Sequence, residues 1–448
     1  MDNLMVIILA AGKGTRMKSK NNKMIHKLAG KSLINHVVDK ALQLSDEVIC
    51  VVGHQAQQVK NVVDQEKVNF VQQNKQLGTG HAVWQARDYL QAHEGDCLVL
   101  YGDTPLITVD TLEKLVQNHK NTQAGMSLLT ARISDPAGYG RIVRDKNNII
   151  TGIVEEDDAD ANTAQIKEVN AGVYTFAGEL LLEALKQVDN DNEQEEYYLT
   201  DTLEYISQKT QLSAHRAAAK EIVGINDRED LAEAERAIQK RINKQHMENG
   251  VTLIDPKSTY IETEVEIERD VTIYPGTVIK KGSKIAENCY IGPNCQLQDA
   301  RLAENVQVKQ GSYIIESEIA AGSQIGPYAH VRPGSVVRKN CKIGNFVELK
   351  KTRVDRGSKI PHLSYVGDGV IGSGCNIGAG TIFANYDGEN KHKTILGERV
   401  FIGSNTTLVA PVELGDDSCT GAGSVVTKDV ENNSIVMGVP ARFYKKNK

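Results

Sequence analysis

The stretch from Ile267 to Leu297 reads IERDVTIYPGTVIKKGSKIAENCYIGPNCQL and has an aliphatic residue at every sixth position. The same spacing continues, with short slips and one long break, as far as Leu414. A period of six matches neither the turn of an α-helix, about 3.6 residues, nor the alternation of a simple strand. It is typical of a parallel β-helix, in which each hexapeptide forms one side of a triangular coil. The aliphatic residue of each hexapeptide points inward, and stacked coils bury a continuous column.

The long break in this repeat is the polar segment ANYDGENKHKT, Ala384–Thr394. A polar excursion from a regular coil is where repeat proteins commonly place functional residues. We therefore expect a loop here, beside a functional site.

The chain before residue 227 has a different pattern. Short apolar runs at 5–10, 47–52, 97–103 and 124–133 predict strands, and amphipathic stretches at 32–44, 81–91 and 109–119 predict helices. This alternation predicts an α/β domain with a mostly parallel sheet. A charged helix is expected from Asp227 to His246, with Gly250 as its stop. The predicted organisation is a domain at 1–226, a linker helix at 227–250 and a β-helix at 251–448.

Composition restricts the partners. With 52 basic and 58 acidic residues the net charge is −6, which argues against binding nucleic acid or an anionic membrane through bulk charge. The apolar start is too short for a signal peptide, and no run is long enough to span a membrane. The seven cysteines form no C-x-x-C pair, so we expect reduced, buried thiols in a cytoplasmic protein.

The stretch LAAGKGTRM, Leu9–Met17, follows the first predicted strand. A dinucleotide fingerprint would need a third glycine where Met17 stands, and the G-K-[ST] of a P-loop is absent. Two interpretations remain, a tight turn or a phosphate cradle. In the cradle, Gly12 and Gly14 would let backbone N–H groups approach a phosphate, and Arg16 and Lys23 would supply charge.

Further motifs favour the cradle. QLGTGHA (76–82), LYGDTPL (100–106), GYGRIV (138–143) and EYYLTD (196–201) follow in order, together with Glu155, Asn170 and Asn226. In this set and order the N-terminal region resembles the sugar-nucleotide pyrophosphorylases, which are nucleotidyltransferases with a Rossmann-like fold. One departure is Asn22, which stands before Lys23 where that family usually has proline; it bears on the rigidity of the loop rather than on its chemistry.

The resemblance implies that a sugar 1-phosphate attacks the α-phosphorus of a nucleoside triphosphate and that pyrophosphate leaves. Arg16 and Lys23 would be catalytic, and Asp103 and Asn226 would bind Mg²⁺. From the residues alone, Asp103 could instead shape a turn before Pro105, and Asn226 could cap the linker helix. The implied nucleotide- and sugar-binding set is Leu9, Ala10, Ala11, Gly12, Lys23, Gln73, Gly78, Thr79, Tyr101, Asp103, Gly140, Glu155, Asn170 and Asn226.

Polar residues on the predicted β-helix suggest a second site. Arg332, Lys350 and Tyr365 are 18 and 15 residues apart, close to the length of one coil, so we expect them to stack along one edge and converge on an anion. His362 belongs to the same edge and is a candidate general base. His392 in the excursion is a weaker candidate for that role.

With both sites included, the whole chain resembles the bacterial bifunctional uridylyltransferase and acetyltransferase family, whose hexapeptide coils form a left-handed β-helix. The resemblance implies that glucosamine 1-phosphate is acetylated from acetyl-CoA at the C-terminal site, and that the resulting N-acetylglucosamine 1-phosphate then receives a uridylyl group from UTP at the N-terminal site. His362 would be the base, and Arg332, Lys350, Tyr365 and Asn376 would bind the amino-sugar phosphate. The implied acetyl-CoA residues, placed between the chains of a homotrimer, are Ala379, Asn385, Tyr386, Ser404, Ala422 and Arg442.

Two alternatives are a pyrophosphorylase whose β-helix is structural or regulatory, and a non-catalytic assembly subunit. Loss of Arg332, Lys350 and His362 from their shared edge would favour the pyrophosphorylase with a structural or regulatory β-helix. Loss of the N-terminal site residues would favour the non-catalytic assembly subunit. Both sets of residues are present.

Overall fold

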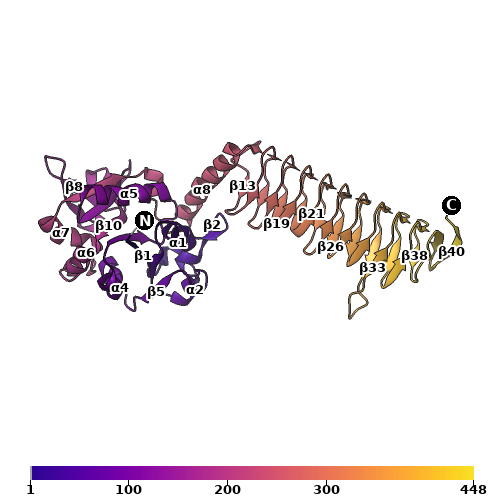
Figure 1. Ribbon diagram of the computed structural model, residues 1–448, viewed down its shortest axis with the longest axis horizontal. Coiled ribbons are helices and arrows are strands. Elements are labelled where there is room, and N and C mark those ends of the chain that lie inside the picture. Colours follow the sequence, from indigo (N-terminus) through magenta and orange to yellow (C-terminus); the bar gives the residue numbers. More distant parts are fainter. Residues whose placement is uncertain (1–2, 448) are drawn as a thin grey trace. The chain divides into compact units, whose positions relative to one another are not determined.

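A computed structural model describes residues 3–447 and divides them into two compact units, the first ending at Ile238 and the second beginning at Gln239 (Figure 1). None of the described helices is long and apolar enough to cross a membrane. The cysteines are unpaired thiols, all buried except the half-buried Cys419, as expected.

The first unit is built on a mixed sheet with the strand order β11-β7-β10-β6-β1-β4-β5. Strand β1 pairs in parallel with β4 and β6, while β10 runs antiparallel to β6 and β7. All residues of β1 are buried, which explains its uninterrupted apolar sequence. The strands are β1 Leu4–Ala10, β4 Glu47–Val52, β5 Asn69–Gln72, β6 Asp96–Tyr101, β7 Met126–Arg132, β10 Glu168–Ala177 and β11 Leu212–Arg216, with β8 Arg141–Arg144 and β9 Ile150–Val154 at one side and a small hairpin of β2 Lys27–Leu28 and β3 Lys31–Ser32.

Two of the expected helices, α1 Leu33–Leu44 and α5 Val109–Thr122, are confirmed. The single helix expected at 81–91 is wrong, because the structure has α3 Thr79–Trp84 and α4 Arg87–Ala92. Between them the N–H groups of Gln85 and Ala86 donate to carbonyls three residues back, which tightens the turn and ends α3. The other helices are α2 Ala56–Lys60, α6 Gly178–Leu185 and α7 Thr202–Lys209, with 3₁₀ turns η1 Thr15–Met17, η2 Lys23–Ile25, η3 Glu156–Asp158, η4 Thr163–Gln165, η5 Leu199–Asp201 and η6 Ala219–Glu221.

The expected charged helix is α8, Arg228–Glu248. Asp227 caps it, because its Oδ1 accepts the N–H groups of Glu229 and Asp230 at 2.9 and 3.0 Å. Beyond its end Gly250 adopts a φ of 90°, a left-handed conformation that favours glycine.

The second unit is the predicted β-helix. One face is a 12-stranded sheet, and the other two faces share a 17-stranded sheet. Neighbouring strands on a face are parallel and about one coil apart in sequence, except for the last two strands of the first face, Ser434–Gly438 and Ala441–Lys446, which form an antiparallel hairpin. Thr272, for example, pairs with Tyr290, which pairs with Gln307. The expected inward aliphatic residues are buried in one continuous cluster, and the half-buried Ile267 packs against it. The solenoid fold is therefore confirmed.

The strands of the first face are β12 Thr252–Leu253, β15 Thr272–Ile273, β18 Tyr290–Ile291, β20 Gln307–Val308, β22 Gln324–Ile325, β25 Lys342–Asn345, β28 Lys359–His362, β31 Asn376–Ile377, β34 Phe401–Ile402, β37 Cys419–Thr420, β39 Ser434–Gly438 and β40 Ala441–Lys446. The other two faces contain β13 Tyr260–Ile261, β14 Glu266–Ile267, β16 Val278–Ile279, β17 Lys284–Ile285, β19 Gln296–Leu302, β21 Tyr313–Ile319, β23 His330–Val331, β24 Val336–Val337, β26 Glu348–Lys350, β27 Arg353–Val354, β29 Tyr365–Gly367, β30 Gly369–Ile371, β32 Ile382–Ala384, β33 Thr394–Leu396, β35 Thr407–Val409, β36 Val412–Leu414 and β38 Val425–Val426. The excursion joins β32 to β33 as a loop that leaves the regular coil near β33 (Figure 1).

Candidate functional site

A cavity of about 440 Å³ lies at the carboxyl ends of β1 and β6. The ends of parallel strands are where open α/β sheets usually bind ligands. Most of the predicted nucleotide set lines this cavity, together with the predicted catalytic Arg16: Leu9, Ala11, Gly12, Lys23, Gln73, Gly78, Thr79, Tyr101, Asp103 and Asn226. The structure thus brings together residues from widely separated parts of the chain. Ala10, by contrast, is buried within β1 and does not line the cavity.

Lys23 lies between the two predicted metal ligands. Its Nζ is 2.5 Å from Asp103 Oδ2 and 3.5 Å from Asn226 Oδ1, and the lysine is 9% exposed. Because Asp227 caps α8, the alternative role of Asn226 as the cap is wrong, and its side chain faces the cavity instead. Lys23 thereby holds a carboxylate oxygen of Asp103 and the amide oxygen of Asn226 close together.

Gly14 allows the loop to approach this lysine. Its φ is 59°, and a Cβ added there would lie 2.7 Å from the Cβ of Lys23. Glycine is therefore required both by the backbone conformation and by the close packing.

Gly140, Glu155 and Asn170, which by resemblance to the pyrophosphorylases would hold the sugar, lie together, outside the nucleotide cavity. The Asn170 N–H donates to the Gly140 carbonyl at 2.8 Å, and a Cβ on Gly140 would lie 3.0 Å from Glu155 Oε2. Glu155 also accepts a hydrogen bond from Thr200 at 3.1 Å and lines a neighbouring acidic cavity of about 550 Å³. Burial raises the pKa of Glu155, and the charges of Asp158 and Asp157 raise it further.

Tyr101 connects the two groups. It lines the nucleotide cavity, and burial raises the pKa of its phenol, which the charge of Glu155 raises further. The nucleotide and sugar residues therefore border on one another at Tyr101.

On the β-helix, His330 pairs with Glu348 on the next coil. Arg332 and Lys350 each lie two residues after a member of this pair, so they occupy equivalent positions on successive coils. Tyr365 does not continue that stack as expected, since its register partner is Glu348 and the partner of Lys350 is Gly367. The coil from Lys350 to its partner Gly367 is 17 residues long, whereas Tyr365 is 15 residues after Lys350, so Tyr365 falls two positions short of the stack. The Tyr365 hydroxyl nevertheless reaches Gly367, where an added Cβ would lie 2.6 Å from it.

The excursion contributes a residue that the sequence analysis missed. Lys391 lies against Lys350 and, with burial and Arg332, lowers the pKa of that ammonium group. Asn385 donates to Asp368 at 2.6 Å, and its side-chain amide also approaches Gly367. The basic residues within the excursion were the available signal, but the sequence does not show which of them reaches Lys350.

His392 has a different role from the one considered for it. Its Nε2 lies 2.6 Å from Asp387 Oδ2, within the excursion. The backbone N–H of Asn390 and the His392 imidazole hold the pKa of Asp387 below its ordinary range. This pair shapes the loop, so His392 is disfavoured as the base.

His362 lies at the end of β28, three residues before Tyr365, and is exposed. Its Nδ1 is 2.6 Å from Asn345 Oδ1 on the preceding coil. An amide oxygen can only accept, so Nδ1 carries the proton and Nε2 keeps a lone pair. Asn345, also missed from sequence, therefore fixes the tautomer suited to a general base.

Three of the predicted acetyl-CoA residues, Ala379, Ser404 and Ala422, occupy on the following coils the same turn that His362 occupies on its own coil. The Gly380 N–H points to the His362 carbonyl at 3.4 Å, the Asn405 N–H donates to the Ala379 carbonyl at 2.7 Å, and the Gly423 N–H donates to the Ser404 carbonyl at 2.8 Å. Ala379, Ser404 and Ala422 thus stand at the same turn of successive coils. Asn376 is half-buried at the start of β31, just before this turn.

Two other predicted residues lie apart from this stack. Tyr386 is exposed in the excursion and its hydroxyl donates to the Gly388 carbonyl. Arg442 is on β40, where, among the described residues, its guanidinium bonds only to the Ala441 carbonyl. The structure does not bring Arg442 to the His362 corner.

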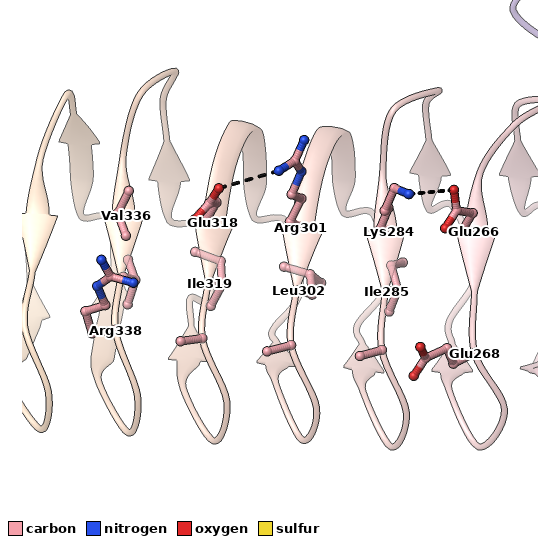
Figure 2. A pocket seen from close by; sticks show the side chains of 14 residues that line it. Glu266, Glu268, Lys284, Ile285, Arg301, Leu302, Glu318, Ile319, Val336 and Arg338 are labelled. Atoms are coloured by element: carbon pink, nitrogen blue, oxygen red, sulfur yellow. Dashed lines mark ion pairs between the residues drawn. The ribbon is translucent and has the colours of Figure 1, made fainter.

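A further groove of about 430 Å³ crosses β17, β19 and β21 and contains none of the predicted site residues. Figure 2 shows its ion pairs, Lys284 with Glu266 at 2.7 Å and Arg301 with Glu318 at 3.7 Å. Its charges largely neutralise one another, so it is not a candidate for the anionic substrates.

Comparison with known proteins covers both units. The nucleotidyl transferase family model matches residues 5–241, and the model of the GMPPB C-terminal domain matches 261–338 and 319–430. The bifunctional protein GlmU of Acetivibrio thermocellus is 47% identical over 440 residues, 98% of this chain and 95% of the relative. The GlmU proteins of Shouchella clausii and Staphylococcus epidermidis are 45% and 48% identical and cover 100% and 96% of the chain, and 99% and 96% of their own lengths.

The chain belongs to the GlmU family.

Membership in the GlmU family confirms the expected bifunctional enzyme of UDP-N-acetylglucosamine synthesis, with uridylyltransferase and acetyltransferase activities. The similarity spans the nucleotidyltransferase unit and the β-helix alike. It therefore speaks against a monofunctional pyrophosphorylase and against a non-catalytic assembly subunit.

Proposed function

We propose that the cavity around Lys23 is the uridylyltransferase site and that the corner around His362 is the acetyltransferase site. The observation that carries the first assignment is the convergence of Lys23, Asp103 and Asn226 in a cavity lined by most of the nucleotide set. The second rests on the Asn345–His362 hydrogen bond and on the cations Arg332, Lys350 and Lys391, which lie together on the β-helix.

In the first site, an oxygen of N-acetylglucosamine 1-phosphate forms a bond to the α-phosphorus of UTP while the bond to pyrophosphate breaks. Arg16 and the N–H groups around Gly12 and Gly14 neutralise the phosphates, and Lys23 adds a positive charge beside them. Gly140, Glu155 and Asn170 orient the sugar beyond Tyr101. The chain's contribution is thus positioning and charge, which phosphoryl transfer chiefly requires.

Mg²⁺ fits the pair of ligands proposed for it. A carboxylate and an amide oxygen are hard donors, and Mg²⁺ commonly binds few protein ligands while keeping water and taking substrate phosphate oxygens. When bound, the ion supplies charge neutralisation at the phosphates. Lys23, by contacting both Asp103 and Asn226, keeps these oxygens at one point in its absence.

In the second site, Nε2 of His362 takes a proton from the ammonium group of glucosamine 1-phosphate. The freed amine forms a C–N bond to the thioester carbonyl of acetyl-CoA, the C–S bond breaks, and CoA leaves as the thiol. Arg332, Lys350, Tyr365 and Asn376 hold the amino-sugar phosphate. The acetyl-CoA is held by Ala379, Asn385, Tyr386, Ser404 and Ala422.

We further propose a homotrimer formed through the β-helix and a cytoplasmic location, and we retain the boundaries 1–226, 227–250 and 251–448. The trimer is supported by the exposed apolar side chains beside His362, namely Phe346 and Leu363, 57% and 59% exposed. Adjacent exposed apolar residues favour a protein contact. The unpaired thiols fit a reducing compartment.

Chelation tests the division of labour between the sites. The unmodified protein should release pyrophosphate from UTP and N-acetylglucosamine 1-phosphate only with Mg²⁺, and should release free CoA thiol from acetyl-CoA and glucosamine 1-phosphate in excess EDTA as well. Pyrophosphate release that survives EDTA would contradict the metal assignment.

A further inference from the structure

Asn22, directly before Lys23, is one of the most completely bonded polar residues of the first unit. It is 2% exposed, and each of its inward polar groups has a partner. Its N–H donates to Gln58 Oε1 at 2.8 Å, its Nδ2 donates to the His54 carbonyl at 2.6 Å, and its Oδ1 accepts the Met24 N–H at 2.8 Å. The last bond caps η2, the turn on which Lys23 stands.

Two of the three partners of Asn22, His54 and Gln58, belong to one segment, Gly53–Gln58, which contacts other walls of the nucleotide cavity. The His54 N–H points to the Ala11 carbonyl at 3.3 Å. A Cβ on Gly53 would lie 2.7 Å from that same carbonyl oxygen and 2.8 Å from Gln76 Nε2, so glycine permits the close approach. The segment therefore links the cradle loop, Gln76 and the turn that carries Lys23.

We propose that Asn22 and Gln58 are positioning residues that hold Lys23 for uridylyl transfer. The inference rests on the proposed role of Lys23. A lysine side chain has several rotatable bonds, so its Nζ keeps a fixed place only where its backbone is held. The backbone of Lys23 is held by the Asn22 cap on one side and by the packing of Gly14 on the other.

Among these hydrogen-bonded residues, Gln58 is the one whose contact with Asn22 can be removed most selectively. Its oxygen is the acceptor for a buried N–H, so Gln58→Ala would leave the Asn22 N–H without a partner, and the turn would shift to recover one. Gln58→Glu keeps an acceptor oxygen at that place. Neighbouring Gln57 provides the matched control, because it is exposed and its side-chain amide donates to Asn61, directly after the same helix, at 2.7 Å.

The experiment measures steady-state uridylyl transfer from UTP, with acetyl transfer by the same chains as the internal standard for folding. Gln58→Ala should lower kcat about 10- to 100-fold, the scale expected for a misplaced catalytic group, with KM for UTP changed less than about 2-fold. Gln58→Glu should recover most of kcat, and Gln57→Ala should match the unmodified enzyme. A lower melting temperature with kcat unchanged would show a merely structural role and overturn the inference.

The Lys23→Ala variant distinguishes failure of the proposed function of Lys23 from failure of the inference about Asn22 and Gln58. If Lys23→Ala leaves uridylyl transfer intact, the proposed function of Lys23 fails. If Lys23→Ala lowers kcat, the inference requires that Gln58→Ala cause no further loss in the Lys23→Ala chain. Full additivity of the two losses would overturn the inference while leaving the proposed function standing.

Discussion

At the scale of single residues, the hydrogen bond between His362 and Asn345 is the most specific feature of the β-helix site. Asn345 lies one coil before His362, and its amide oxygen holds the Nδ1 proton. Outer partners of this kind orient an imidazole and fix its tautomer. Neither residue would be paired with the other from sequence, because a coil of 17 residues rather than 18 places them opposite each other.

We expect Asn345→Ala to lower kcat for acetyl transfer about 10-fold, because the loss of an orienting partner to a functional imidazole commonly has an effect of this size. Uridylyl transfer should be unchanged. The two reactions can be followed in parallel as release of CoA thiol and of pyrophosphate. Equal acetyl transfer by the variant and the unmodified enzyme would show that the Nδ1 contact does not matter.

The pH dependence of sugar binding should report the ionisation of Glu155. The pKa of Glu155 is raised above that of an ordinary glutamate, which is near 4.3. As the pH falls, Glu155 therefore becomes protonated at a higher pH than an ordinary glutamate does. In the proposed site, the ionised form of Glu155, which is present above the raised pKa, would accept hydrogen bonds from the sugar. KM for N-acetylglucosamine 1-phosphate should therefore rise as the pH falls through that value.

Glu155→Gln is the control for this prediction, because the substrate phosphate also titrates in a mildly acidic range. Its KM should be higher at neutral pH and should change less on acidification. Parallel pH profiles for the two enzymes would contradict a role for the Glu155 charge.

At the scale of elements, the inward aliphatic column carries the stability of the β-helix. Ile291 is fully buried in that column, whereas Ile254 at the start of the same unit is 51% exposed. Ile291→Ala should cost about 2 to 5 kcal/mol of unfolding free energy in the unit, the range for buried large-to-small changes. Ile254→Ala should cost far less, and denaturant unfolding followed together with acetyl transfer measures both.

The same elements show what the sequence could predict. The six-residue period placed the aliphatic positions because only one geometry repeats at that spacing, and the buried run of β1 identified a central strand. The break between α3 and α4 was missed because Gln85 and Ala86 are acceptable helix residues, and only a local tightening of the turn separates the two helices. The offset of Tyr365 was missed because the sequence does not show the length of an individual coil, and the coil from Lys350 to Gly367 is two residues longer than the 15-residue spacing to Tyr365.

The nucleotide site was predictable for a different reason. Its motifs resemble, in set and order, those of the sugar-nucleotide pyrophosphorylases, and several of them follow predicted strands, whose ends a parallel sheet brings to one edge. The contacts of Asn22 with Gln58 and His54 were not predictable, because they join segments about 35 residues apart through side chains of ordinary composition. For the same reason Lys391 could be placed in a loop, but its contact with Lys350 could not be foreseen.

At the scale of the whole molecule, two compact units carry two reactions on one chain. Asp103 lies in the unit that ends at Ile238, and His362 lies in the unit that begins at Gln239. Each unit has its own hydrophobic core, so a change in one site should leave the other reaction intact. We therefore expect the two reactions to take place at separate sites.

The most direct test is a reciprocal pair of substitutions, each assayed for both reactions at a fixed chain concentration. His362→Ala should abolish release of CoA thiol from acetyl-CoA and glucosamine 1-phosphate while pyrophosphate release from UTP and N-acetylglucosamine 1-phosphate persists. Asp103→Ala should abolish pyrophosphate release and spare CoA release. If either substitution disabled both reactions in a chain that still folds and assembles like the unmodified protein, the assignment of separate sites would be contradicted.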